Sequence, residues 1–245
     1  MILAAGLGTR LRPLTDHIPK TLLPVGGAPI IVWNLLLLRR HGVKEVMINL
    51  HHLGHMIKQR LGDGSQWGIH IQYSLEPNLL GTGGGIKAVE SFFEGGSFLV
   101  MNGDTLIELD LTELVECHRS RSGVATMVLR EDPEVERWGV IETTRNHRVV
   151  TINGRGRRPL SSDPPPLHYM FAGVHVIQPQ LLRHCPPGKP SSIIDAYVAE
   201  LENGAVVQGY VAKGYWSDIG TEERLARAHQ DVEAGLFSLP AGEPA

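Results

Sequence analysis

The chain has 245 residues, of which 42% are hydrophobic and 20% are charged, and its formal net charge is −3. This length and composition are typical of a globular protein with one well-buried core. The slightly negative net charge argues against a nucleic-acid-binding protein with a broad basic surface, whereas a small anionic ligand needs only local cations.

Short apolar runs alternate with helical patterns through the first half of the chain. The runs predict strands, and the patterns between them predict helices. The expected strands are residues 2–5, 45–50, 69–74 and 98–102. The expected helices are residues 29–41, 55–61 and 82–93, and Gly42 is expected to end the first of them. This alternation predicts an α/β fold with βαβ units in a mainly parallel mixed sheet that has helices on both faces.

Strand patterns dominate after about residue 123. The expected strands are residues 125–130, 138–143, 149–153, 170–177 and 206–211. A helix is expected to start at Ser192 and to end at Gly204, and a last amphipathic helix opens at Thr221. No long linker interrupts the chain, so we predict a single domain over residues 1–245.

A basic loop, GLGTRLRPLTDHIPKTLLPV at residues 6–25, directly follows the first expected strand. Ligands of an open parallel sheet bind at the carboxyl ends of its strands, so this loop stands where a ligand would bind. Gly6 and Gly8 allow sharp turns that present backbone N–H groups, and Arg10 and Lys20 add fixed positive charge. The loop predicts a polyphosphate site, and a surface loop with solvated cations is the alternative. It contains neither GxxxxGK[ST] nor GxGxxG.

A second glycine cluster, GTGGGIK at residues 81–87, opens an expected helix. Three consecutive glycines leave room for a flat chemical group to lie against the backbone. A tight turn followed by close packing of the helix explains the same residues equally well. Both interpretations stay open.

Two acidic residues stand in short polar segments after apolar runs: Asp104 in NGDT and Asp218 in WSDIGT. Mg²⁺ commonly takes one or two protein carboxylates and completes its octahedron with water and phosphate oxygens. The two residues are therefore candidate magnesium ligands, if the fold brings them together beside the basic loop. For Asp104 alone, an Asx-turn is the simpler explanation.

The sequence contains no sign of secretion or membrane insertion. Cys117 and Cys185 are far apart and form no CxxC pair, which suits the reducing cytoplasm. The apolar stretch PIIVWNLLLL, which begins at Pro29, is too short to cross a bilayer. We expect a cytoplasmic protein without a nucleic-acid or membrane partner, and a homo-oligomer stays open.

Taken together, these motifs resemble the signature of the sugar-1-phosphate nucleotidylyltransferases, GxGTRLxPLT followed by PKxLxPV. The resemblance continues in family order through EPNLLGTGGGI, NGDT, RWGVIE, FAGVHV and YWSDIGT, and it covers about residues 1–230. Within the family, the chain looks most like bacterial mannose-1-phosphate guanylyltransferase-type enzymes. Heptose-1-phosphate guanylyltransferases and N-acetylmuramate-1-phosphate uridylyltransferases are close neighbours.

The resemblance implies a Rossmann-like nucleotidyltransferase fold. It also implies transfer of a nucleotidyl group from an NTP, expected to be GTP, to a sugar 1-phosphate, expected to be mannose 1-phosphate, with release of pyrophosphate. The single domain would comprise a nucleotide-binding half (about residues 1–123), a sugar-phosphate-binding half (about residues 124–220) and a C-terminal helix (221–235) before a frayed tail.

Carried over position by position, the resemblance assigns the site residues. It implies that Arg10 and Lys20 are catalytic and that Asp104 and Asp218 bind Mg²⁺. The implied nucleotide-binding residues are Leu3, Ala4, Ala5, Gly6, Gly8, Thr9, Arg10, Lys20, Glu76, Gly81 and Thr82. The implied sugar-phosphate-binding residues are Asn102, Gly139, Arg158 and Gly173. Arg158 stands in RRP where many members carry EKP, and this departure leaves the identity of the sugar open.

Two other classes of function stay open at this point. A catalytically silent sugar-nucleotide sensor would bind the same ligands, although the presence of Arg10, Lys20, Asp104 and Asp218 weighs against it. A dinucleotide-dependent oxidoreductase is disfavoured because the GxGxxG fingerprint is missing.

Overall fold

The computed structural model describes residues 1–157 and 164–238. The chain forms two compact units that interleave along the sequence. The first unit comprises Met1–Leu79, Met101–Leu111 and Gly214–Ala245, and the second comprises Leu80–Val100 and Thr112–Lys213. The predicted fold class, a mainly parallel mixed sheet flanked by helices, is confirmed. The predicted division of the domain at about residue 123 stays a prediction.

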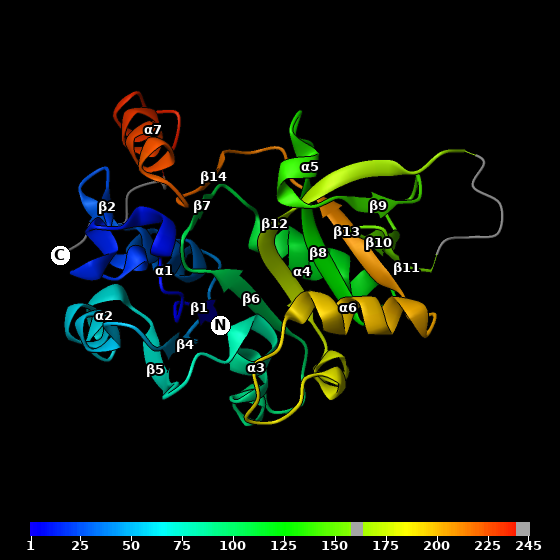
Figure 1. The fold of residues 1–245 in the computed structure, drawn as a ribbon, viewed down its shortest axis with the longest axis horizontal. Helices are drawn as coiled ribbons and strands as arrows, with labels where there is room; N and C mark the ends of the chain where they lie inside the picture. The colour runs from blue at the N-terminus through cyan, green and yellow to red at the C-terminus, as the bar shows by residue number, and fades with distance from the viewer. Residues whose placement is uncertain (158–163, 239–245) are drawn as a thin grey trace. The chain divides into compact units, whose positions relative to one another are not determined.

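The first unit contains a parallel sheet in the strand order β6-β1-β4-β5, to which β6 contributes its last two residues (Figure 1). Its strands are β1 (Ile2–Leu3), β4 (Glu45–Leu50), β5 (His70–Leu75) and β6 (Phe98–Asn102). Ile2 of β1 pairs with Ile48 of β4 on one side and with Met101 of β6 on the other. In chain order this arrangement is 3-2-1-4, the order found in Rossmann-type sheets. The carboxyl ends of all four strands therefore lie at one edge.

Helices α1 (Ile30–Arg40) and α2 (Gly54–Leu61) connect the strands of the first unit. The expected end of α1 at Gly42 is confirmed, because Gly42 has a left-handed φ of 76°. Its N–H donates to Arg39 O, and the N–H of Val43 donates to Leu38 O, which is a Schellman motif. Within the described residues, no helix combines the length and apolarity that a membrane span requires.

A second, two-stranded sheet of the first unit consists of β7 (Thr105–Ile107) and β14 (Trp216–Asp218), which pair antiparallel. The hairpin β2 (Pro24–Val25) and β3 (Ala28–Pro29) lies between the basic loop and α1. Helix α7 (Glu222–Glu233) begins after Thr221, whose Oγ1 accepts from the N–H of Arg224 at 3.3 Å, so the predicted helix start is confirmed. One buried cluster joins these elements to the loop: Leu11, Leu23, Val25, Ile30, Leu106, Ile219, Ala228 and Phe237.

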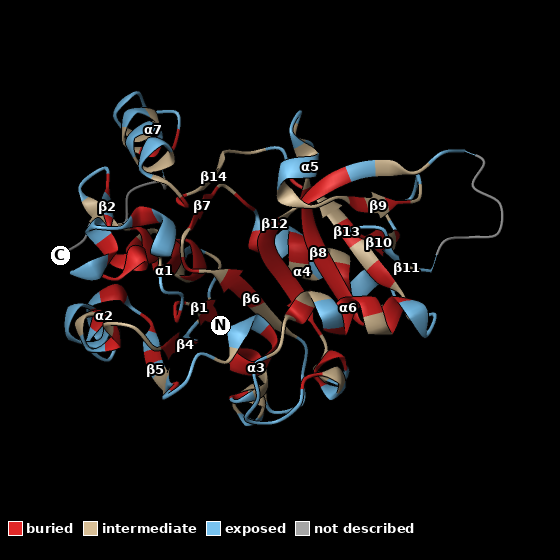
Figure 2. Cartoon of the chain, in the orientation of Figure 1, coloured by how far each residue is buried: buried red, intermediate tan, exposed pale blue. Residues whose placement is uncertain are grey.

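The second unit is built around β8 (Ala125–Arg130), which pairs antiparallel with β12 (Leu167–Ile177) and parallel with β13 (Val207–Val211). Strands β9 (Ile141–Thr143), β10 (Val149–Ile152) and β11 (Arg155–Gly156) extend this sheet from β12. Figure 2 shows β8 and β12 buried along most of their length. The helices of the unit are α3 (Gly81–Lys87), α4 (Leu111–Ser120), α5 (Val135–Trp138) and α6 (Ile193–Glu202).

The strand expected at residues 138–143 was wrong at its start, because Trp138 ends α5 and β9 begins only at Ile141. Gly139, which has a φ of 93°, breaks the helix and redirects the chain. The helix expected from Ser192 is confirmed as α6, since the Ser192 hydroxyl accepts from the N–H of Ile194 at 3.2 Å. A polar N-cap is thus visible in the sequence, whereas a one-turn helix before a strand is not.

Candidate functional site

The basic loop of the first unit is a chain of three single 3-10 turns: Thr9–Leu11, Leu14–Asp16 and Lys20–Leu22. The first of these turns begins after Gly8, which has a left-handed φ of 64°. The carbonyl of Gly8 accepts from the Thr15 hydroxyl at 2.8 Å and from the N–H of Leu11 at 2.9 Å. A Cβ at position 8 would lie 2.8 Å from Cγ2 of Thr15, so both conformation and space require glycine here.

Buried apolar residues hold the loop in place, while its polar residues remain accessible. Leu11 and Val25 are fully buried, whereas Thr9 and Arg10 are exposed. Anchoring of this kind restricts the loop before any ligand binds, which lowers the entropic cost of binding. The interpretation as a preorganised basic loop is therefore favoured over a surface loop with freely moving cations.

Asp104 and Asp218 lie next to each other at the ends of β7 and β14. Asp218 pairs with Thr105, and the N–H of Ile219 donates to the carbonyl of Asp104 at 3.0 Å. The two residues are thus neighbours at the end of one antiparallel ladder, although 114 positions separate them in the chain. The sequence identified both acids as candidate metal ligands, but it did not predict the strand pairing that brings the two residues together.

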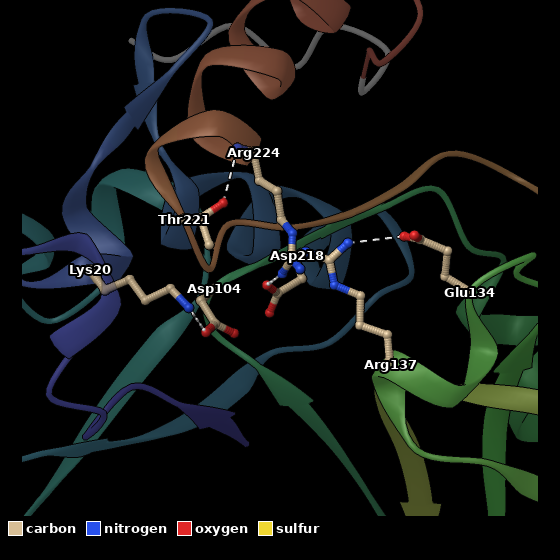
Figure 3. A network of polar contacts seen from close by, with 7 residues as sticks. All are labelled: Lys20, Asp104, Glu134, Arg137, Asp218, Thr221 and Arg224. Carbon is tan, nitrogen blue, oxygen red and sulfur yellow. Dashed lines mark hydrogen bonds and ion pairs between the residues drawn. The ribbon is translucent and has the colours of Figure 1, made fainter.

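Each carboxylate has a cationic partner in the first unit (Figure 3). The Lys20 ammonium donates to Oδ2 of Asp104, and the Arg224 guanidinium donates to Oδ1 of Asp218 at 2.7 Å. The four side chains are between 10% and 26% exposed, so both pairs are partly shielded from water. Arg224 was missed by sequence reasoning, because its position in a polar helix resembles that of any surface arginine.

Arg10 also lies near Asp218, and Gly220 provides the space for both side chains. A Cβ at position 220 would lie 3.0 Å from Nη2 of Arg10 and would collide with Oδ1 of Asp218. The absence of a side chain at Gly220 therefore allows the guanidinium and the carboxylate to lie against the backbone. Three cations (Arg10, Lys20 and Arg224) face two carboxylates, which leaves a net positive charge suited to an anion.

The donor set also fits Mg²⁺. Two carboxylates on adjacent strands supply the hard oxygen ligands that this ion takes from proteins, with room for phosphate oxygens and water. Among the described residues there is no group of three or more His, Cys, Asp or Glu side chains that could hold a metal. The magnesium assignment to Asp104 and Asp218 stays a prediction.

A buried hydrogen-bonded chain crosses the carboxyl ends of β1, β4 and β5. The N–H of Ala4 donates to Oδ1 of Asn49 at 2.8 Å, and Nδ2 of Asn49 donates to Oε1 of Glu76 at 2.7 Å. Asn49 and Glu76 are each only 2% exposed. His51 adds a ring N–H to the carbonyl of Glu76 at 2.7 Å. Sequence reasoning missed Asn49, whose only signal is that a polar residue interrupts the apolar run EVMINL.

The second glycine cluster belongs to the second unit, where it packs closely. A Cβ at Gly81 would lie 2.7 Å from Ser191 O, and one at Gly84 would lie 2.6 Å from Lys189 O. The Thr82 hydroxyl accepts from the N–H of Ile193 at 3.0 Å. Close packing therefore accounts for the buried glycines, whereas Gly81 and Thr82 themselves are exposed, and their nucleotide contact stays a prediction.

The expected sugar-phosphate residues are spread over the fold. Asn102 ends β6, and its carbonyl accepts from Nδ2 of Asn34 at 3.5 Å. Gly139 has no room for a side chain, since a Cβ would lie 2.7 Å from Oδ1 of Asn153. Gly173, with a φ of 78°, lies where the register between β12 and β8 shifts. Arg158 lies outside the described residues. These four assignments stay predictions.

Comparison with known proteins gives consistent matches. Residues 1–235 match the family described as nucleotidyl transferase. The chain is 33% identical to a UTP–glucose-1-phosphate uridylyltransferase of Synechocystis sp., over 90% of this chain and 59% of that protein. It is 32% identical to a mannose-1-phosphate guanylyltransferase of Mycobacterium tuberculosis, over 98% of this chain and 66% of that protein.

A third relative is similar in length to this chain. An N-acetylmuramate alpha-1-phosphate uridylyltransferase of Neisseria meningitidis is 36% identical, over 93% of this chain and 95% of that protein. Among solved structures, HddC from Yersinia pseudotuberculosis complexed with GMP-PN superimposes with a TM-score of 0.77 at 26% identity, over 94% of this chain and 97% of that one. The chain thus spans less than two thirds of the first two relatives and nearly all of the third. It belongs to the nucleotidyl transferase family, as its sequence motifs predicted.

Proposed function

We propose that this protein transfers a nucleotidyl group from an NTP to a sugar 1-phosphate, which yields an NDP-sugar and pyrophosphate. The observation that carries the proposal is the pair Asp104 and Asp218 at one strand ladder, surrounded by Arg10, Lys20 and Arg224. Family membership supports the reaction class, since the named relatives are sugar-1-phosphate nucleotidylyltransferases.

The reaction is a direct displacement at the α-phosphorus. An oxygen of the sugar phosphate forms the new P–O bond while the bond to the β-phosphate oxygen breaks, and pyrophosphate leaves with that electron pair. No protein nucleophile is needed, because a phosphate monoester is already largely ionised at neutral pH. The first obstacle is the repulsion between two anions.

The cations Arg10, Lys20 and Arg224 offset this repulsion. Arg10 and Lys20 lie where they can neutralise the polyphosphate, and the rigid Arg10 fork can bridge two phosphate oxygens. Arg224 keeps the Asp218 carboxylate in one orientation. Asp104 and Asp218 would hold Mg²⁺, which when bound supplies further positive charge at the phosphates. Catalysis is then mainly positioning and charge stabilisation.

For the base and the sugar, we propose GTP and mannose 1-phosphate. An ionised glutamate accepts hydrogen bonds only, and guanine presents two adjacent donors, its ring N–H and its amino group. Uracil presents one N–H between two carbonyls, which would face the Glu76 carboxylate unfavourably. The mannose-1-phosphate guanylyltransferase relative supports the same choice.

The second candidate is uridylyl transfer to N-acetylmuramate 1-phosphate. The observation in its favour is the relative of that name, which is 36% identical and matches this chain over 95% of its own length. It shares the reaction and the phosphate chemistry with the first candidate and differs in base and sugar.

Pyrophosphate release from the four common NTPs, each with several sugar 1-phosphates, tests both candidates. GTP with mannose 1-phosphate should give the highest kcat/KM, and UTP with N-acetylmuramate 1-phosphate would instead favour the second candidate. Asp104→Asn serves as the inactive control. Absence of release with every pair, from a protein that still binds nucleotide, would favour a silent sensor and overturn the proposed reaction.

A further inference from the structure

The carboxyl ends of three adjacent strands meet at one amide side chain. Asn49 is the second-last residue of β4, the middle strand of the three, with Leu3 of β1 opposite it on one side and Ser74 of β5 on the other. Its side chain reaches Ala4, the residue after β1, and Glu76, the residue after β5. Only a residue on the central strand can contact both neighbours at once.

The orientation of the Asn49 amide follows from its partners. The N–H of Ala4 can only donate, so the atom 2.8 Å away must be the amide oxygen. The amide nitrogen then faces Glu76 and donates to Oε1 at 2.7 Å. A flipped amide would place two donors against each other at Ala4 and two oxygens against each other at Glu76. The backbone thus sets the polarity of the whole chain of hydrogen bonds.

Because Asn49 and Glu76 are buried, their hydrogen bonds strongly restrict the geometry of this part of the first unit. Asn49 and Glu76 are each 2% exposed, so water competes little for their hydrogen-bonding groups. A buried group that loses its partner pays the full desolvation penalty, and a connected network is held more rigidly than its separate bonds. The Glu76 carboxylate and the Ala4 backbone are therefore fixed relative to each other.

We propose that Asn49 is a positioning residue for the nucleotide: through one amide it sets the geometry of both the β1–loop junction at Ala4 and the Glu76 carboxylate. This inference rests on the proposed function, with Ala4 and Glu76 taken as nucleotide-binding residues, as the sequence motifs predict. Asn49 itself contacts no reacting atom. Its loss should act first on nucleotide affinity and base preference, and less on the chemical step.

Four variants test this role, with Glu76→Gln alone as a reference. Asn49→Ala removes both hydrogen bonds. Asn49→Asp keeps an acceptor for Ala4 but sets a carboxylate against Glu76. The double variant Asn49→Asp/Glu76→Gln restores a donor–acceptor pair with reversed polarity. Ile48→Val, one position earlier on β4, is the matched control, since it trims the same buried strand without removing a hydrogen bond.

The measurements are equilibrium binding of GTP and UTP by titration calorimetry, steady-state kcat and KM, and the melting temperature. Asn49→Ala should raise the Kd and KM for the nucleotide about tenfold, the scale of one buried hydrogen bond to a charged group, with a smaller change in kcat. Asn49→Asp should bind still more weakly than Asn49→Ala in the wild-type background. The same substitution should cost about tenfold less affinity in the Glu76→Gln background, so the double variant is compared with Glu76→Gln alone. Ile48→Val should melt at a lower temperature with unchanged Kd.

Nucleotide affinity within twofold of wild type in folded Asn49→Ala would overturn the inference and leave the proposed function standing. An equal loss of affinity from Asn49→Asp in the wild-type and Glu76→Gln backgrounds would overturn it as well, and this comparison decides the matter if Asn49→Ala fails to fold. If the wild-type protein itself binds no NTP, the proposed function fails instead.

Discussion

Two polar clusters, one in each unit of this protein, treat ionisable side chains in opposite ways. In the first unit, Asp104 and Asp218 are paired with Lys20 and Arg224 at positions that retain some exposure to water. In the second unit, Nδ1 of His175 lies 2.7 Å from the Tyr197 hydroxyl. Both side chains of this pair are buried, and burial lowers the pKa of His175 to about 3. Burial also raises the pKa of Tyr197.

The difference separates a binding site from a core. Charges removed from water are costly unless opposite charges and residual hydration offset the loss, and Asp104 and Asp218 have both. Such groups can exchange partners with an incoming phosphate or cation. Burial favours the neutral forms of His175 and Tyr197 instead, and this pair contributes hydrogen bonding and packing. The strongly lowered pKa of His175 therefore marks a buried core position.

The largest expected effect comes from removing the charges in the first unit. Asp104→Asn and Asp218→Asn should each lower kcat by about 10³-fold, because each removes several kcal/mol of charge stabilisation from the transition state. Circular dichroism should show the fold retained, since asparagine has the same shape. A folded variant with near-wild-type turnover would show that its carboxylate is not needed for catalysis.

Glu76 is as buried as His175 but lies in the first unit, so it tests whether a buried side chain there binds the nucleotide. Glu76→Gln should lower kcat/KM for GTP. The expected loss of transition-state stabilisation is about 1–3 kcal/mol, the scale of a hydrogen bond to a charged group. It should also narrow the preference for GTP over UTP, since a glutamine can pair with either side of uracil. If the ratio of the two efficiencies stays constant, or if the wild type prefers UTP, Glu76 does not select guanine.

His175 tests the other side of the comparison through the pH dependence of stability. Its folded-state pKa of about 3 lies below the ordinary value of 6.5, so the unfolded chain takes up a proton first as the pH falls. The contribution of His175 to the free energy of unfolding is fully present above pH 6.5. It is lost as the pH falls toward 3, by about 1.4 kcal/mol per pH unit in that window.

Urea denaturation at pH 7, 6, 5 and 4 measures this slope. His175→Gln keeps a polar partner for Tyr197 but cannot titrate, so its unfolding free energy should depend less on pH than that of the wild type. Equal slopes for the two proteins would contradict the assignment of the acid sensitivity to His175.

Arg10→Lys preserves the charge of the loop and changes only its shape. Because an ammonium cannot bridge two phosphate oxygens, kcat should fall about tenfold while nucleotide affinity changes less. Steady-state kinetics together with equilibrium binding separate the two quantities. Equal losses in both would mean that Arg10 contributes only uniform binding.

The smallest effect is expected at Arg224. Arg224→Gln should raise the KM for the nucleotide by about threefold to tenfold, because Asp218 loses its charged partner while the other cations remain. Arg227→Gln, one turn further along α7, is the matched control, since Arg227 pairs with Asp231 at 3.1 Å and is 74% exposed. If both variants behave alike, the effect belongs to the charge of the helix and not to Asp218.

Local features of the fold were determined by the sequence alone. The alternation of apolar runs and helical patterns predicted the parallel strands, and Gly42, Ser192 and Thr221 marked helix ends that the structure confirms. These signals work because each depends on the backbone preference or hydrogen-bonding capacity of a residue and its near neighbours. The ordered motifs likewise identified the family.

The tertiary structure alone decided which of these residues meet. The pairing of β7 with β14 places Asp218 beside Asp104, and the central position of β4 lets Asn49 contact both Ala4 and Glu76. Arg224 is visible as a partner of Asp218 only after α7 has been placed at the end of β14. The physical reason is that such contacts join residues far apart in the chain, and their free energy depends on burial and geometry that the folded chain creates and that no local pattern encodes.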